Sequence, residues 1–270
     1  MLVCAPRPRA SLSRRAVACY SARMDASIPK PAQSLRGLEG VLVKMFTRTA
    51  SVSAIEQLSD NFRLITLSGP KLCGVRWVPG MKVQMALGGF TARTYTPIEW
   101  DGTNGVTRLV AFAHGDAPGA RWIRGLEVGA SAPVFGPSSS LDLTALSRPA
   151  LLFGDETSIG LAHALRSTEQ GSQGVSIVLE VNSKAESGAV LARLQIEGVT
   201  SIERKPDDAH HVELEALVEA ELKARAIVSA ALSGKAPSIQ RVNKKLRALG
   251  LGNRQLRTKA YWAPGKAGLD

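Results

Sequence analysis

The sequence contains few of the features that mark a membrane protein or a disulfide-stabilised one. Apolar residues make up 44% of the chain, but no segment approaches the eighteen or so uninterrupted apolar residues that a membrane span needs. The three cysteines, Cys4, Cys19 and Cys73, form no CxxC or Cys/His pattern, which argues against a disulfide framework and against a zinc site. We therefore expect a protein with a packed core, no membrane span and a reducing, cytoplasmic location.

Aromatic residues are also scarce, at 5%, and no helix-turn-helix, zinc-finger or RNP pattern is present. The sequence pI near 10.0 therefore does not indicate a nucleic-acid-binding protein. The net charge of +11 is concentrated at the two ends, because residues 1–24 carry five arginines and no acid and residues 235–270 carry nine basic side chains and one acid. We expect the basic C-terminal part to face a small anionic ligand.

Residues 1–34 are expected to be a disordered extension or a wrongly assigned start. The first 24 residues are rich in Arg and Ser and lack the apolar run of a secretory signal. The Arg14-Arg15 pair resembles a twin-arginine signal, but no apolar region follows it. An organellar transit peptide and a true start at Met24 are alternatives that the sequence leaves open.

Residues 35–145 have the pattern of a small antiparallel barrel. Short strands are predicted at 62–67, 83–87, 91–98 and 106–113, with Gly, Pro and Asp-Gly between them. Strands at this spacing, with little helical periodicity, are typical of a barrel.

Residues 146–270 have a different pattern. Buried strands are predicted at 150–153, 175–181, 199–202 and 226–232, and helices after residue 158, at 212–223 and from Ser238 to Gly250. Buried strands that alternate with helices indicate a parallel sheet with crossover connections. The predicted fold class is a β-barrel followed by an α/β, Rossmann-like parallel-sheet domain.

The segment Arg93–Pro97 is the most informative part of the predicted barrel. In an alternating strand, Arg93 and Tyr95 point to one face, and Thr94 and Thr96 to the other. An arginine fork can clamp a pyrophosphate, a tyrosine can lie against a flat ring, and a threonine hydroxyl can bond to a ring nitrogen. An ordinary strand, with Arg93 on the surface and Tyr95 packed in the sheet, is the alternative.

The loop from His114 to Trp122 follows a buried strand and contains the small residues Gly115, Gly119 and Ala120. Small residues let a ligand approach the backbone, and successive N–H groups can hold phosphate oxygens. The alternative is a plain strand-to-helix connection in which Trp122 is part of the core and His114 is structural.

The turn after the first strand of the second domain contains Gly154, Asp155, Glu156 and Thr157. In an open α/β sheet this turn faces the ligand crevice, which favours nucleotide binding. It is not a GxGxxG motif, and two carboxylates are poor neighbours for a pyrophosphate. Asp155 and Glu156 can equally be helix-start residues that the helix dipole favours.

The C-terminal helix carries a run of basic residues on its polar side, and more follow it. Arg241, Lys244, Lys245 and Arg247 lie on the helix, and Arg254, Arg257 and Lys259 come before Tyr261-Trp262. A solvated helix face is the ordinary interpretation of such a run. The aromatic pair is less ordinary, because it can cover a flat ring.

Four of these segments occur in the order and spacing of a known family. They are RTYTP (93–97), HGDAPGARW (114–122), GDETSIGLA (154–162) and LRALGLGNRQLRTKAYWAPG (246–265). Over residues 36–266 the chain resembles the siderophore-interacting proteins, a branch of the ferredoxin-NADP reductase-like flavoenzymes.

The resemblance implies an FAD-dependent ferric-siderophore reductase. FAD would be held mainly by the barrel, through Arg93, Thr94, Tyr95 and Thr96 and through the loop with His114, Gly115, Gly119, Ala120 and Trp122. Gly154, Asp155, Glu156 and Thr157 would lie by the nicotinamide nucleotide, and Tyr261 and Trp262 would cover the flavin. Arg241, Arg257 and Lys259 are the candidates for an anionic ferric siderophore or for the 2′-phosphate of the nicotinamide cofactor.

The resemblance also implies the electron path. Electrons would pass from NADPH or NADH, with ferredoxin as a further candidate donor, through the flavin to the ferric siderophore, and Fe(II) would be released in the cytoplasm. No catalytic side chain and no protein-bound metal are expected, because the flavin supplies the redox chemistry.

The chain departs from the family pattern before its last helix. The family usually has a tryptophan and an acidic Gly-Glu-Ala where this chain has Ala-Leu-Ser-Gly-Lys-Ala (231–236). The donor and the siderophore are therefore left open. Two rivals remain: an NAD(P)H:flavin or ferredoxin-type reductase with a non-iron acceptor, and a non-catalytic siderophore-binding or nucleic-acid-binding module whose barrel holds no flavin.

Overall fold

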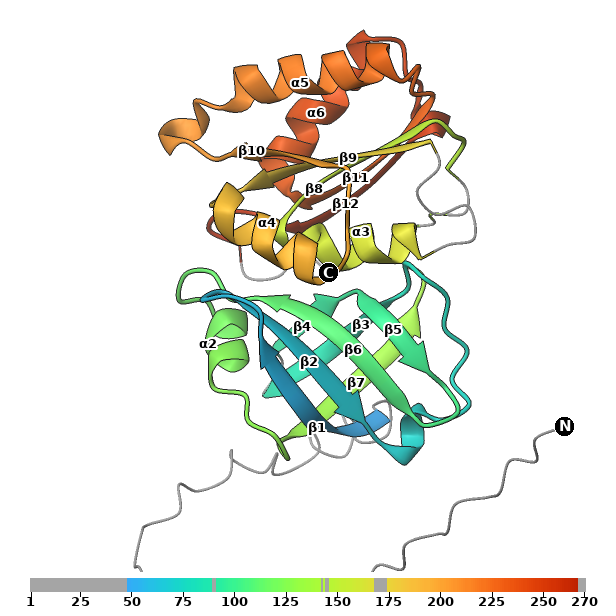
Figure 1. Cartoon of the computed structure of the whole chain (residues 1–270), viewed down its shortest axis with the longest axis vertical. Helices are drawn as coiled ribbons and strands as arrows, with labels where there is room; N and C mark the ends of the chain where they lie inside the picture. Colours follow the sequence, from blue (N-terminus) through green and yellow to red (C-terminus); the bar gives the residue numbers. More distant parts are fainter. Residues whose placement is uncertain (1–47, 89–90, 142, 144–145, 168–173, 267–270) are drawn as a thin grey trace, which may run out of the picture. The chain divides into compact units, whose positions relative to one another are not determined.

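The computed structural model describes residues 48–88, 91–141, 143, 146–167 and 174–266. Residues 1–34 lie outside these ranges, so the predictions for them, including the Arg14-Arg15 pair, fall outside the described residues. The described strands form two sheets, one antiparallel and one parallel (Figure 1).

Seven strands of the described residues form the antiparallel sheet, in the order β4-β3-β7-β1-β2-β6-β5. The elements of this part are β1 (Arg48–Gln57), β2 (Phe62–Ser68), η1 (Pro70–Leu72), β3 (Lys82–Gly88), β4 (Thr91–Tyr95), β5 (Pro97–Asp101), β6 (Val106–Phe112), α2 (Pro118–Arg124) and β7 (Ser131–Ser138). The inward side chains of β1, β2, β3, β6 and β7 share one core with α2, which contributes Ala120 and Ile123. A sheet that encloses its own core in this way is a barrel.

The predicted strand 91–98 is divided at Thr96 into β4 and β5. These two strands are neighbours in the sequence but lie at opposite edges of the sheet. Thr96 therefore marks the place where the two edges of the curled sheet meet.

The parallel sheet has the order β10-β9-β8-β11-β12. Its elements are β8 (Ala150–Asp155), η2 (Glu156–Ser158), α3 (Ile159–Arg166), β9 (Val175–Val181), α4 (Lys184–Arg193), β10 (Val199–Glu203), η3 (Pro206–Asp208), α5 (His211–Ala224), β11 (Ser229–Lys235), α6 (Ala236–Ala248), η4 (Asn253–Gln255) and β12 (Leu256–Trp262). The strand order reverses between β8 and β11, and ligands of doubly wound sheets bind beyond the carboxyl ends of the strands at such a point.

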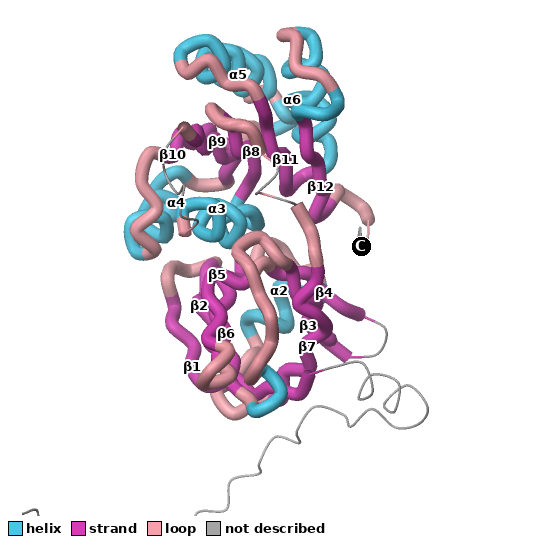
Figure 2. The backbone as a smooth tube through the Cα atoms, turned by 90° about the vertical axis from the view of Figure 1, so that its right-hand side faces the viewer, coloured by secondary structure: helices cyan, strands magenta, loops and turns pink. Residues whose placement is uncertain are grey.

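Helices cover both faces of the parallel sheet (Figures 1 and 2). Leu152 of β8 and Ile177 of β9 share a core with α3 and α4, whereas Leu151 and Phe153 share another with α5 and α6. This alternation along β8 explains why its side chains are apolar on both faces and why the segment has no period-two pattern.

The barrel and the parallel sheet are in direct contact. Phe62 of β2 belongs to the same apolar cluster as the buried residues of α3. The carboxylate of Glu186 in α4 accepts hydrogen bonds from Ser59 Oγ (2.7 Å) and from the Asn61 backbone N–H (2.9 Å). Gly160 of α3 lies so close to the barrel that a Cβ there would be 2.7 Å from the Thr96 carbonyl oxygen.

The predicted fold class is confirmed: a barrel precedes an α/β domain with a Rossmann-like sheet. Among the described residues, no helix combines the length and the apolar character that a membrane span needs. β1, α2, β7, α4 and β12 were not predicted, and the strand expected at 226–232 runs from Ser229 to Lys235.

Candidate functional site

Arg93 lies on β4 beside the first turn of α2. A Cβ on Gly119 would be 3.3 Å from Arg93 Cγ, so the glycine is what allows the arginine stem to lie this close to the helix. No side chain caps the N-terminus of α2, which begins at Pro118 after Ala117. A guanidinium next to an uncapped helix N-terminus is suited to a pyrophosphate, because both present N–H donors and positive charge.

Tyr95 and Trp122 pack next to each other on the barrel core, with ring centroids 6.2 Å apart and planes tilted by 37°. Burial raises the pKa of the Tyr95 hydroxyl, so it stays neutral. Thr94 points to the other side of β4 because successive strand residues alternate. The structure thus brings Arg93 next to Gly119 and Tyr95 next to Trp122, and Ala120 belongs to the same core.

Thr96 lies at the junction of the two sheets and not on an open barrel surface. It is only 8% exposed, and its side chain is hydrogen-bonded to Tyr261 of β12. Burial raises the pKa of Tyr261 to about 12, and its hydroxyl is also hydrogen-bonded to Ser233. Ser233 Oγ in turn donates to Ser158 Oγ at 2.8 Å, so a row of hydroxyls runs from the barrel to the first turn of the second domain.

Asp155 ends β8 at the point where the strand order reverses. Its Oδ1 accepts from the Thr157 backbone N–H at 2.9 Å, and its Oδ2 accepts from Trp262 Nε1 at 2.8 Å. Gly234 of β11 has φ 100°, and a Cβ there would be 2.4 Å from Asp155 Oδ2, so only glycine fits. Burial, and then the charge of Glu156, raise the pKa of Asp155 to about 6.

His114 lies between the end of β6 and the end of β12. Its ring is 5.1 Å from that of Trp262 and 5.3 Å from that of Phe112. Burial lowers the pKa of His114, which favours the neutral imidazole. Gly115 follows with φ 60°, a conformation that favours glycine and turns the chain toward α2.

Glu156 is not available to a nucleotide, because Arg204 holds it. Arg204 Nη2 is 2.6 Å from Glu156 Oε2, and Nη1 is 3.0 Å from Oε1. The guanidinium also donates to Glu180 Oε1, the Glu180 carbonyl and Asn182 Oδ1, so all five of its N–H groups are used. Burial acts to lower the pKa of Arg204, but the hydrogen bond and charge of Glu156 outweigh it and raise the pKa.

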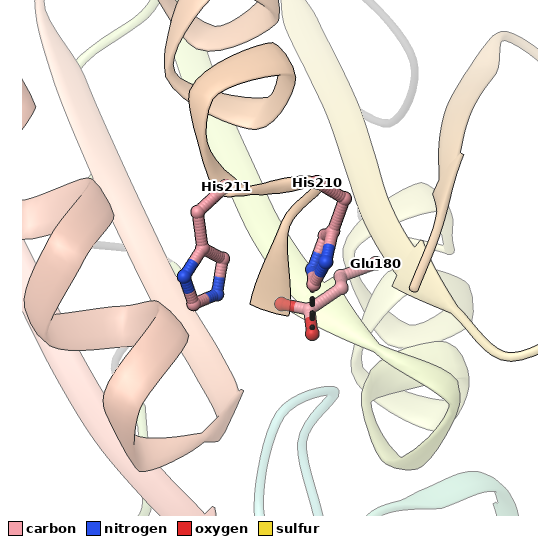
Figure 3. A group of neighbouring side chains, drawn as sticks. All are labelled: Glu180, His210 and His211. Carbon is pink, nitrogen blue, oxygen red and sulfur yellow. Dashed lines mark ion pairs between the residues drawn. The ribbon is translucent and has the colours of Figure 1, made fainter. Parts of the chain in front are cut away.

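Glu180, which pairs with Arg204, also lies close to His210 and His211. Figure 3 shows the three side chains, whose nitrogen and oxygen atoms lie within 4.8 Å of one another. His210 Nδ1 accepts from the Lys205 backbone N–H at 3.2 Å, which places the proton of the neutral ring on Nε2. That nitrogen is 3.3 Å from Glu180 Oε1, although without hydrogen-bond geometry. A metal-binding histidine normally donates from its second nitrogen, whereas here that nitrogen accepts. We therefore interpret the group as a buried His–Glu pair and assign no metal to it.

The three basic residues predicted for a siderophore do not come together. Arg257 and Lys259 alternate with the α6-facing residues Leu256 and Ala260, so they share the other face of β12 with Tyr261. Arg241 lies on α6, where its Nε is 2.5 Å from Glu215 Oε1 of α5.

Sequence reasoning missed several residues that build this region. They are Ser158, Glu180, Arg204, Ser233 and Gly234. Ser233-Gly234-Lys235 had a detectable signal, because a polar and flexible end to a buried strand marks a close approach of backbone or ligand. Arg204 had none, since its partners are 24 and 48 residues away in the sequence.

No family model matches the chain, and no curated protein matches its sequence. Solved structures do match. A siderophore utilization protein from T. fusca is 18% identical with a TM-score of 0.69, covering 83% of this chain and 95% of that one. A siderophore-interacting protein from Aeromonas hydrophila is 17% identical with a TM-score of 0.66, covering 82% and 92%.

The likeness extends to ferredoxin-reductase-like folds. Phthalate dioxygenase reductase, which transfers electrons from pyridine nucleotides to [2Fe-2S], is 11% identical with a TM-score of 0.66, covering 83% of this chain and 70% of that one. The resemblance predicted from the four sequence segments is thus confirmed at the level of the fold.

Proposed function

We propose that this protein, which shares its fold with siderophore-interacting proteins, is a flavoprotein reductase that passes electrons from NADPH or NADH through FAD to a ferric siderophore. One observation carries the proposal: Arg93 and Tyr95 lie side by side on the strand that packs against the uncapped N-terminus of α2. We take residues 35–145 as the FAD-binding domain and residues 146–270 as the nucleotide-binding domain.

The residues of the barrel fit FAD chemically. Arg93 would hold the pyrophosphate beside the first turn of α2, where Gly119 leaves room for the arginine stem. Tyr95 would lie along the isoalloxazine ring. Thr96, whose side chain is hydrogen-bonded to Tyr261, would exchange that bond for one to the polar edge of the ring. When bound, FAD supplies the chemistry, since a flavin accepts two electrons and passes them on singly, as ferric iron requires.

The turn from Gly154 to Thr157 would position the donor nucleotide at the reversal point of the sheet. Trp262 is fixed there by Asp155 and His114, so a flat aromatic ring with a set orientation lies at the edge of the proposed crevice. Its role would be to cover the flavin and exclude water. Glu156 is bound by Arg204 and would not take part in holding the nucleotide. Ferredoxin is a further candidate donor.

For the acceptor, we propose an anionic ferric siderophore, with release of Fe(II) in the cytoplasm. Arg257 and Lys259 support this, because they share a face of β12 with Tyr261 and carry no ion pair within the described residues. The likeness to two siderophore proteins adds to it. A ferredoxin-type reductase with a non-iron acceptor is the second candidate, favoured by the likeness to phthalate dioxygenase reductase.

The first test is the absorbance spectrum of the purified protein. We expect a flavin band near 450 nm and release of FAD on denaturation, and Arg93→Ala should lower FAD occupancy sharply. Anaerobic reduction with NADPH, NADH and reduced ferredoxin, followed by mixing with ferric siderophores and with non-iron acceptors, separates the two candidates. A correctly folded protein that takes up no flavin would refute both.

A further inference from the structure

A shallow cavity of about 320 Å³, open to solvent, lies between α6 and β12 on the face of the sheet opposite Tyr261, and Gln240, Lys244, Arg247 and Thr258 are exposed in it. It is lined by Ile239, Gln240, Asn243, Lys244, Arg247 and Thr258. Gln240, Asn243, Lys244 and Arg247 are spaced i, i+3, i+4 and i+7, so they form one stripe along the helix. Thr258 is on β12, the edge strand of the sheet. This volume is at the lower end of the range for small-molecule sites.

The cations of α6 fall into two groups. Arg241 and Lys245 face α5, where they pair with Glu215 and Glu219 at 2.5 Å each. Lys244 and Arg247 line the cavity instead, and within the described residues neither has a carboxylate partner. The sequence thus neutralises one side of the helix and leaves the other side charged.

The lining of the cavity is complementary to an anion. None of its six residues is acidic, and five of them carry hydrogen-bond donors. Arg247 Nε donates to Asn243 Oδ1 at 2.8 Å, which orients the guanidinium. The bond uses the oxygen of the Asn243 amide and not its N–H groups. A fixed guanidinium next to an ammonium and neutral donors is the arrangement that binds carboxylates and phosphates.

We propose that this cavity is a binding site for a small polyanion with carboxylate or phosphate groups, separate from the flavin site. It lies beside Thr258, four residues before Trp262, so about 13 Å of strand separates it from the proposed flavin edge. The site does not depend on the proposed reductase activity. Its ligand is held by the Lys244 ammonium and the Arg247 guanidinium, with Gln240, Asn243 and Thr258 as neutral donors.

The test is calorimetric titration of the full-length protein with citrate, as a tricarboxylate, and with pyrophosphate at low ionic strength. We expect saturable binding of at least one of the two, tighter than about 1 mM. Citrate alone would identify a carboxylate site, pyrophosphate alone a phosphate site, and both a general polyanion site. No saturable binding of either would overturn the proposal.

Two double variants remove equal charge from the same helix and provide the control. Lys244→Gln with Arg247→Gln should weaken binding at least about tenfold, whereas Arg241→Gln with Lys245→Gln should leave it within about twofold. Thr258→Glu, which adds a carboxylate at the cavity wall, should also abolish binding. Equal losses in both double variants would show a general charge effect and refute the site. Flavin content, measured on the same samples, reports separately on the proposed reductase function.

Discussion

The indole nitrogen of Trp262 donates a hydrogen bond of 2.8 Å to the carboxylate of Asp155, 107 residues earlier in the chain. The bond joins the last strand of the parallel sheet to the first, across Gly234 of the strand between them. The same indole contacts the ring of His114 from the barrel. One side chain therefore connects the barrel, the reversal point of the sheet and its edge strand.

Trp262 should report the ionisation of Asp155. Because burial raises the pKa of Asp155 to about 6, above its ordinary value of about 3.9, the folded state holds this proton more tightly than the unfolded state. The contribution of Asp155 to the free energy of unfolding therefore falls as the pH rises from about 4 to about 6, and is then constant. We expect Trp262 fluorescence to change with a midpoint near pH 6.

Two variants isolate this signal from the other three tryptophans. Asp155→Asn places an amide where a carboxylate oxygen accepts from the indole, and should remove the transition near pH 6. Trp262→Phe should remove it as well, because Trp77, Trp100 and Trp122 are not bonded to Asp155. A transition of wild-type size in either variant would show that another group is responsible.

Gly119→Ala should weaken flavin binding without unfolding the barrel. A Cβ at 3.3 Å from Arg93 Cγ forces the arginine stem to move by a few tenths of an ångström. We expect FAD affinity to fall about tenfold, as measured by fluorescence titration. Gly188→Ala is the matched control, since a Cβ there meets nothing within 4 Å, and it should leave FAD affinity unchanged. Equal FAD affinity in the two variants would contradict the placement of the pyrophosphate next to Arg93.

The sequence was sufficient for the parts of the fold that depend on local pattern. The strand at 175–181 was predicted with its observed bounds, because a mostly apolar run of strand length between turn signals leaves little choice. β12 was missed because its residues, Leu-Arg-Thr-Lys-Ala-Tyr-Trp, carry charge at alternate positions on an edge strand and resemble a solvated segment. The division at Thr96 was missed because barrel closure is a long-range event.

The candidate site, too, could be predicted only in part from the sequence. Arg93, Tyr95, Gly119 and Trp122 could be grouped from the sequence because the resemblance supplied their roles, and the structure brings them together. The grouping of Arg241 with Arg257 and Lys259 rested on charge alone. Charge does not specify which face of a sheet a residue occupies, and α6 and the outer face of β12 are on opposite sides.

Arg204 should be important for stability. Its guanidinium is the counter-charge of Glu156 and Glu180, whose side chains are 2% and 0% exposed. Arg204→Ala leaves two buried carboxylates without their counter-charge. The free energy of unfolding, measured by urea denaturation, should fall by about 3–5 kcal/mol.

Arg193→Ala provides the comparison, because Arg193 pairs with Glu56 at 2.8 Å but is 63% exposed. This exposed pair should contribute no more than about 1 kcal/mol. Arg204→Lys should be intermediate, since an ammonium keeps the charge but cannot make the paired hydrogen bonds. Similar costs for Arg204→Ala and Arg193→Ala would mean that the buried carboxylates are satisfied in another way.

The positions of the basic residues on β12 and α6 predict which of them the proposed acceptor should contact. Arg257 and Lys259 share a face of β12 with Tyr261, whereas Arg241 is bonded to Glu215 on the opposite side of the sheet. An anionic ferric siderophore that reaches the flavin edge should therefore meet the first two residues and not the third. Arg257→Ala, alone and with Lys259→Ala, should raise KM for anionic ferric chelates several-fold and leave KM for neutral ones unchanged.

Arg241→Ala is the control, because it removes the same charge and should change neither KM. If Arg241→Ala and Arg257→Ala raise KM equally, or if neutral chelates are affected as strongly as anionic ones, the acceptor does not bind at this face of β12.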